Sequence, residues 1–249
     1  MKITKARHTI IPNRLKTANE TAGPKRMFLL AGSPRGDGTR TLDVLKQAIA
    51  ETCVPRPVVA YVGTASGDDR QFFNYLESIL VQCGAGEVHL CPLVGRRADQ
   101  CLSKDILCRC DMVFISGGEV EDGITGIPDD IKSLLADLRN DGTVFAGMSA
   151  GTIMLGRSWP HWNDEDDDFD NARLFDCLGF SSAIFDTHAE DDGFIELRKA
   201  IELSGGEAIG YGIPSDCAII ENPDGSIVDV GDILLCKYVS GRTVLETMQ

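Results

Sequence analysis

From Met27 onward, short apolar runs alternate along the chain with longer amphipathic segments. The apolar runs predict strands at 27–32, 58–65, 87–93, 112–118 and 144–149. Segments between several of them have apolar residues at helical spacing and predict helices at 39–52, 68–83 and 129–140. Strands that are apolar on both faces and separated by helices indicate a mostly parallel sheet covered on both sides. We therefore predict an α/β three-layer sandwich.

The second half of the chain has a different pattern. After an acidic connection at 161–175, the predicted elements are a strand at 181–188, a helix at 193–204 and a β-meander over 207–239. Asn222–Gly225, with the sequence NPDG, is the predicted hairpin turn of this meander. No internal repeat or low-complexity linker divides the chain. We predict a single α/β domain over 26–249, preceded by an N-terminal extension over 1–25.

The composition narrows the class of protein. The 249 residues are 43% hydrophobic and carry a formal net charge of −14, which argues against nucleic acid or an anionic membrane as the main partner. No apolar run approaches the roughly 20 residues of a membrane span, and the extension lacks the apolar core of a secretory signal. The nine cysteines include no C-x-x-C pair and suit a reducing, cytoplasmic location. A metal or redox site in the cluster 101–110 is a weaker alternative, because no paired spacing elsewhere supports it.

The segment VFAGMSAGTIML, at 144–155, places a serine between two glycines. A predicted strand leads into Ser149 and a helix can begin directly after it, as in the G-x-S-x-G elbow that presents a nucleophile. The small neighbours permit a sharp turn, and N–H groups at the helix start can stabilise an oxyanion. The alternative is a glycine-rich turn that packs a helix onto its strand, and the motif alone leaves both interpretations open.

A serine nucleophile requires a base, and the candidates are His8, His89, His161 and His188. His188 ends a predicted strand, and the carboxyl ends of strands are where active-site residues gather in such sheets. A lone histidine at a strand end can equally be structural. Paired with a nucleophile elbow, His188 is the best candidate base.

Four segments together resemble the serine peptidase family that contains dipeptidase E and cyanophycinase. They are VFISGGEVEDGI at 113–124, GMSAGTI at 147–153, FDTHAEDDGFIELRKAI at 185–201 and YGIPSDCAIIENPDGSIVDVG at 211–231. The segments occur in the family's order, and the resemblance extends from Met27 to the C-terminus. It implies a class I glutamine-amidotransferase-like fold with a flavodoxin-like core. It also implies hydrolysis of a peptide or isopeptide bond next to an aspartyl residue.

Carried over by position, the resemblance implies Ser149 as nucleophile and His188 as general base. The N–H groups of Gly118 and Ala150 would form the oxyanion hole. The implied partner is a small peptide or isopeptide substrate, with no nucleic acid, membrane, cofactor or metal, and a homodimer remains an open possibility.

The sequence departs from the family pattern at several positions. The third member of the triad is a glutamate in the family, and that position falls on Ser215 in GIPSDCA. Asp216, one position later, and Asp186, two residues before the histidine, are the alternative carboxylates. In the segment after the predicted strand at 112–118, Glu119 stands where the family has Asp or Asn, and Val120 stands in place of Gln. Glu119 is a candidate substrate-binding residue at this position. Losing the orienting acid of a triad costs about 10⁴ in rate, so the third member decides how active the protein is.

An aspartyl substrate requires a cation for its carboxylate. Arg157 is a candidate close to the elbow, and Arg35 and Arg70 lie near predicted strand ends. The acidic run 163–170 could bind a basic substrate group or a divalent cation, although a solvated acidic loop is the favoured interpretation.

Two other functions compete with the hydrolase. The run FLLAGSPRGDGTRTLDVLKQAI, at 28–49, resembles the phosphate loop of flavodoxin-like FMN reductases, and its glycines and helix start suit a phosphate. It covers a small part of the chain, and aromatic residues make up only 6% of the sequence, so few are available to surround a flavin. A catalytically impaired binding protein that retains the fold is the other alternative.

Overall fold

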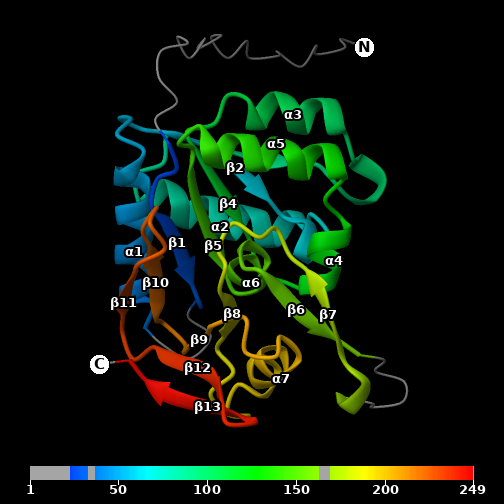
Figure 1. Ribbon diagram of the computed structural model, residues 1–249. Coiled ribbons are helices and arrows are strands. Elements are labelled where there is room, and N and C mark those ends of the chain that lie inside the picture. Colours follow the sequence, from blue (N-terminus) through cyan, green and yellow to red (C-terminus); the bar gives the residue numbers. More distant parts are fainter. Residues whose placement is uncertain (1–22, 33–36, 163–168, 249) are drawn as a thin grey trace, which may run out of the picture.

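The computed structural model describes residues 23–32, 37–162 and 169–248 (Figure 1). Its centre is a seven-stranded sheet with the order β11-β10-β1-β5-β4-β2-β3. The strands are β1 (Met27–Leu30), β2 (Val58–Val62), β3 (Glu87–Cys91), β4 (Met112–Ile115), β5 (Val144–Met148), β10 (Ala218–Glu221) and β11 (Ile227–Val230). The first five pair in parallel, whereas β10 pairs antiparallel with both β1 and β11. The carboxyl ends of the parallel strands therefore meet at one edge of the sheet.

Helices cover both faces of this sheet. One face packs against α1 (Thr39–Glu51) and α2 (Arg70–Gln82). The other packs against α3 (Gln100–Leu107), α4 (Val120–Thr125), α5 (Asp129–Asn140) and α6 (Ala150–Leu155). Alternation along β1 explains the two cores, because Phe28 and Leu30 join the first and Met27 and Leu29 the second, all fully buried. The predicted α/β class with a mostly parallel sheet is confirmed.

Two smaller sheets lie beside the central one. A four-stranded sheet has the order β13-β12-β9-β8. Its strands are β8 (Ile184–Thr187), β9 (Gly210–Ile213), β12 (Leu234–Val239) and β13 (Arg242–Thr247), and a separate hairpin joins β6 (Ser158–His161) to β7 (Arg173–Asp176). Helix α7 (Ile195–Leu203) packs on the four-stranded sheet through Leu197, Ile201 and Cys236. Figure 1 shows this sheet and α7 at the end of the molecule opposite α3 and α5.

The C-terminal strands divide between two sheets and do not form one continuous meander. All four residues of β10 are buried, which suits a strand inside the central sheet, whereas β12 has one buried residue and five that are partly or fully exposed. The predicted turn at Asn222–Gly225 is confirmed, because the Asn222 N–H donates to the Ser226 carbonyl at 2.8 Å between β10 and β11. The prediction of a single domain after an N-terminal extension stays a prediction.

Three shorter features complete the description. Single 3-10 turns occur at Thr64–Ser66, Gly95–Arg97 and Phe169–Asn171. Across the described part of the chain, no helix is both long and apolar enough to cross a membrane. All nine cysteines are unpaired, and the described residues contain no group of three or more His, Cys, Asp or Glu side chains that could hold a metal ion.

Candidate active site

Ser149 stands between the end of β5 and the start of α6, in a backbone conformation that serine rarely adopts. Its φ is 54° and its ψ is −124°, values close to those of glycine in a tight turn. The Ser149 N–H donates to the Leu30 carbonyl at 2.9 Å, so the turn is tied to the end of β1. The predicted strand–turn–helix elbow is present, and it lifts the Ser149 side chain out of the sheet.

The two glycines of the elbow are required by close approach of the backbone. A Cβ on Gly147 would clash with the Gly151 carbonyl, and a Cβ on Gly151 would clash with the Ile115 carbonyl of β4. Thr152, which stands where the family has alanine, is fully buried, and its hydroxyl donates to the Leu30 carbonyl at 2.8 Å. This unusual residue therefore adds a second tie between the elbow helix and β1.

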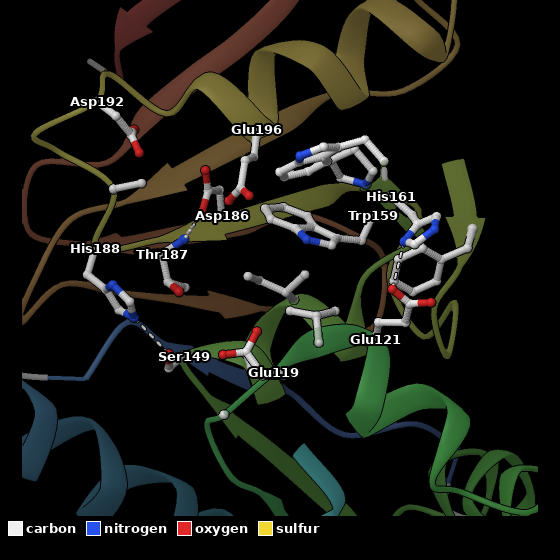
Figure 2. Close-up of a pocket in the computed structure, with 18 residues that line it drawn as sticks. Glu119, Glu121, Ser149, Trp159, His161, Asp186, Thr187, His188, Asp192 and Glu196 are labelled. Atoms are coloured by element: carbon white, nitrogen blue, oxygen red, sulfur yellow. Dashed lines mark hydrogen bonds and ion pairs between the residues drawn. The ribbon is translucent and has the colours of Figure 1, made fainter. Parts of the chain in front are cut away.

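His188 follows β8 and reaches the serine from the smaller sheet. Its Nε2 lies 2.7 Å from the Ser149 Oγ (Figure 2). The His188 N–H donates to the Ile213 carbonyl at 2.9 Å, which fixes the main chain of this segment against β9. The structure thus brings together the predicted nucleophile and the predicted base at hydrogen-bonding distance.

Gly118 and Ala150 flank the serine from the ends of β4 and β5. Gly118 has a φ of 142°, and a Cβ there would clash with the Ala65 carbonyl, so only glycine fits. The neighbouring Glu119 N–H donates to that same carbonyl at 2.8 Å and holds the loop in place. Within residues 23–32, 37–162 and 169–248, neither the Gly118 nor the Ala150 N–H donates to a backbone carbonyl, which leaves both able to meet an oxyanion.

These groups open into a cavity of about 490 Å³. Its lining comes from the ends of β4, β5 and β8 and from α4, α6, α7 and the β6–β7 hairpin. Five of the lining side chains are carboxylates: Glu119, Glu121, Asp186, Asp192 and Glu196. Among the described residues that line it, none is a lysine or an arginine. The cavity adjoining the serine therefore has a strongly negative lining.

Comparison with known proteins assigns the family. The model of peptidase family S51 matches residues 27–227 of this chain. The chain belongs to peptidase family S51. This confirms the family that the four motifs resemble, and with it the prediction of a serine peptidase.

Two solved structures are similar to this S51 peptidase in fold. The structure of a peptidase from an acI-B1 actinobacterium gives a TM-score of 0.69 at 14% identity, covering 92% of this chain and 99% of that one. A putative peptidase E from Listeria monocytogenes EGD-e gives a TM-score of 0.56 at 14% identity, covering 87% of this chain and 100% of that one. No curated protein matched the sequence.

The S51 peptidase departs from the predicted triad at its third member. Asp216 bonds to α1, because its Oδ1 accepts hydrogen bonds from the Thr41 N–H at 3.0 Å and the Thr41 hydroxyl at 2.9 Å. Its carboxylate thereby caps the first turn of α1 and occupies donors that the FMN interpretation assigns to a phosphate. Ser215, at the usual acid position, donates its N–H to the Glu190 Oε1 at 2.6 Å.

Asp186 is also turned away from His188. It is 2% exposed, its Oδ1 accepts from the Thr187 N–H at 2.7 Å, and its Oδ2 is buried without a hydrogen-bond partner among the described residues. Burial and the nearby Glu196 and Asp192 carboxylates raise the pKa of Asp186 to about 8. In the part of the chain that the structure describes, the His188 ring bonds only to Ser149, so neither proposed acid completes a triad in this conformation.

Of the predicted substrate-binding residues that the structure describes, Glu119 lines the cavity and the arginines do not. Glu119 lines the cavity, and Figure 2 shows its carboxylate on the same side as Ser149. Arg157 is not in the cavity, because it is exposed and pairs with Glu207 at 3.3 Å. Arg70 begins α2 and lies over the Phe73 ring. Arg35 and the acidic run 163–168 lie outside the described residues.

The prediction missed the aromatic side of the cavity. Trp159 and Trp162, the two tryptophans of the chain, line it from the β6–β7 hairpin. His161 also lies there, with its Nδ1 2.7 Å from the Glu121 Oε2. Both tryptophans occur in SWPHW at 158–162, directly after the elbow helix. The position of both tryptophans so close in sequence to the candidate nucleophile could have predicted this lining, because aromatic side chains commonly line ligand sites.

Proposed function

We propose that this S51 peptidase cleaves a small peptide or isopeptide by acyl transfer through Ser149, with His188 as the general base. The observation that carries the proposal is the 2.7 Å distance between the Ser149 Oγ and the His188 Nε2 at the strained elbow. A serine hydroxyl is a weak nucleophile unless a positioned base accepts its proton, and this distance is within reach for that transfer.

The reaction would proceed in two stages. The Ser149 Oγ attacks the scissile carbonyl as its proton passes to the His188 Nε2, and the oxyanion accepts hydrogen bonds from the Gly118 and Ala150 N–H groups. His188 then donates the proton to the leaving amine, which departs and leaves an acyl-serine. Water hydrolyses this ester with His188 again acting as base, and the free serine is restored.

The histidine in this proposal works without a carboxylate at its second ring nitrogen. The backbone bond from the His188 N–H to the Ile213 carbonyl positions its main chain, but it supplies no charge to stabilise an imidazolium. We therefore expect a Ser–His pair that is slower than a complete triad.

The charge of the cavity bears on the predicted aspartyl preference. An aspartyl side chain would require a cation, whereas the described lining contains five acidic residues and neither lysine nor arginine. We propose a small peptide or isopeptide as the substrate class and do not assign the aspartyl residue to this cavity.

A fluorophosphonate probe tests the nucleophile directly, because it reacts covalently with an activated serine. We expect one adduct per chain, located on Ser149 by peptide mass spectrometry, absent in Ser149→Ala and formed much more slowly in His188→Ala. Ser66→Ala, in the loop after β2, is the matched serine control and retains labelling. A folded protein that forms no adduct and cleaves no α- or β-aspartyl, neutral or basic dipeptide would be a binding protein instead.

A further inference from the structure

The loop that carries the Gly118 N–H rests on a turn that follows β2. We call residues 63–68 the supporting turn, and it contains the 3-10 helix Thr64–Ser66. Its Ala65 carbonyl accepts a hydrogen bond from the Glu119 N–H at 2.8 Å, and a Cβ on Gly118 would clash with the same carbonyl. The residue that would supply an oxyanion donor therefore lies directly against the supporting turn.

A second hydrogen bond joins the supporting turn to α4, the helix that begins just after this loop. The Thr64 hydroxyl donates to the Gly123 carbonyl at 2.8 Å, and Thr64 is 2% exposed. Gly123 is buried in the second half of α4. The carbonyls in the last turn of a helix have no partner within the helix, so the Thr64 hydroxyl satisfies a group that would be costly to leave without a donor.

These two bonds hold both ends of the segment 118–123. Glu119, at its start, bonds to Ala65, and Gly123, at its end, bonds to Thr64. A Cβ on Gly123 would clash with Met154 of α6 and would lie 3.0 Å from the Ala65 Cβ. The segment is therefore packed closely between the supporting turn and α6, with little room to move towards either.

The supporting turn is itself fixed at its far end. Asp68 has a left-handed backbone with a φ of 55°, and its N–H donates to the Gly63 carbonyl at 2.9 Å, which closes the turn. Its Oδ2 accepts hydrogen bonds from the Leu93 N–H at 2.7 Å and the Val94 N–H at 2.8 Å. Because these bonds tie the turn to the segment after β3, the turn provides a fixed support for the loop that it contacts.

We propose that Thr64 is a positioning residue for the oxyanion hole, because its hydroxyl holds the Gly123 carbonyl and thereby keeps the Gly118 N–H directed at the oxyanion. Thr64 does not line the cavity, so it acts through the backbone of the segment 118–123. A donor contributes most when its direction is fixed before the reaction, and a displacement of about 1 Å can cost about 10²-fold in rate. The inference rests on the proposed function, since the oxyanion in question forms on attack by Ser149.

Thr64→Val tests the proposal, because valine has the shape of threonine and lacks the hydroxyl. Labelling of Ser149 by the fluorophosphonate is followed at a series of probe concentrations, which separates the rate constant at saturation from the half-saturating concentration. We expect the rate constant at saturation to fall about tenfold and the half-saturating concentration to change by less than about twofold, since the oxyanion develops only in the reaction step. Thr64→Ser keeps the hydroxyl and should retain the wild-type rate constant.

Thr52→Val is the matched control for lost stability. Thr52 is also buried, and its hydroxyl donates to the Ile49 carbonyl at 2.7 Å at the C-terminal end of α1. Melting curves should show that both valine variants fold and that both are destabilised, whereas labelling in Thr52→Val should match wild type. Ser66→Ala removes a hydroxyl that bonds within the supporting turn, to the Gly63 carbonyl at 3.0 Å, and should also leave labelling unchanged. Equal slowing in Thr64→Val and Thr52→Val would mean that lost stability alone slows labelling, and the proposed role of Thr64 would be wrong.

Amide hydrogen exchange tests whether the effect passes through the loop. The Glu119 N–H is protected by its bond to the Ala65 carbonyl, and a loosened segment should open more often. We expect faster exchange in a peptide that spans residues 117–125 in Thr64→Val, and wild-type exchange there in Thr52→Val. Slower labelling without faster exchange would overturn the positioning role.

The two proposals fail in different ways. Labelling of Ser149 at the same rate in Thr64→Val and in the wild-type protein would keep the peptidase and remove the positioning role of Thr64. A wild-type protein that forms no adduct on Ser149 would remove the proposed catalysis, and with it the oxyanion that Thr64 is proposed to serve.

Discussion

The two sides of the cavity are built in different ways. The catalytic side is made of small residues and backbone, with Gly118, Ser149 and Ala150 at the ends of β4 and β5, and only His188 comes from outside the central sheet. The opposite side is made of larger side chains, among them Trp159 on β6, Asp186 on β8 and Glu196 on α7. Asp186 and Glu196 lie on this side, yet among the described residues the His188 ring has its hydrogen bond with Ser149 and none with a carboxyl group. The difference shows that the elbow and the opposite side of the cavity are built by separate parts of the fold.

The largest effect is expected from Gly118→Ala, which tests the oxyanion donor on the side of the cavity that is built from backbone groups. The added Cβ would clash with the Ala65 carbonyl and force the Gly118 N–H away from the oxyanion. We expect the rate of fluorophosphonate labelling to fall about 10²–10³-fold, as for the loss of one oxyanion donor. Gly179→Ala is the control, because Gly179 also has a positive φ of 66° but no atom within 4 Å of the added Cβ. Unchanged labelling in Gly118→Ala would remove this N–H from the mechanism.

The next effect concerns the contribution of the buried Asp186 side chain to stability. Because the pKa of Asp186 in the folded protein is about 8, above the roughly 3.9 of an unfolded chain, the folded state holds a proton that the unfolded state has lost. The stability of the wild-type protein therefore falls as the pH rises through this window. Asp186→Asn removes that dependence. We expect its free energy of unfolding at pH 8 to be about 2 kcal/mol higher than that of the wild-type protein.

Urea unfolding at pH 5, 6, 7 and 8 measures this dependence. The advantage of Asp186→Asn over wild type should grow across the series. Asp137→Asn, on an exposed position of α5, serves as the control and should show no such growth. A constant difference between Asp186→Asn and wild type would mean that Asp186 is already ionised in the folded protein.

The third effect tests whether the absence of a carboxylate beside His188 limits the reactivity of Ser149. Ser215 occupies the position where the family has its glutamate, and Ser215→Glu would return a negative charge to the loop after β9. We expect labelling of Ser149 to become about tenfold faster, because a carboxylate orients the imidazole and stabilises its charged form. Ser215→Gln has the same length without the charge and should give no acceleration. Equal rates in the two variants would show that the Ser–His pair is limited by something else.

The smallest effect is expected from Thr152→Ala. The buried Thr152 hydroxyl ties α6 to the Leu30 carbonyl of β1, and its loss should lower the free energy of unfolding by about 1 kcal/mol. Thr125→Ala removes an exposed hydroxyl that bonds to the Glu121 carbonyl at 2.8 Å and should cost less. Urea unfolding compares the two, and equal costs would show that the tie adds nothing beyond an ordinary surface bond.

Sequence patterns predicted the central fold well because burial on both faces leaves a strong signal. The apolar runs at β1, β2, β3, β4 and β5 each marked a real strand. The division of the C-terminal strands between two sheets was not predicted, since local alternation specifies a strand but not its partner. The long-range pairing of β10 with β1 depends on tertiary packing that no local pattern contains.

The candidate site was predictable where chemistry requires a particular backbone, as at Ser149 and Gly118. It was less predictable where side chains from distant elements meet. Asp216 was a reasonable candidate acid by its position, but it caps α1 because Thr41, which is remote in sequence, presents two donors to it. Arg157 was chosen for its proximity to the elbow in sequence, yet Glu207 holds it at the surface.

The backbone of Ser149 has a consequence for how this sequence can change over time. At a φ of 54° and a ψ of −124°, glycine is the residue with the lowest conformational cost, so replacing the serine would relieve strain of order 1 kcal/mol or more. Drift guided by stability alone would therefore carry this position towards glycine. A serine that remains there is the outcome expected when selection acts on its hydroxyl.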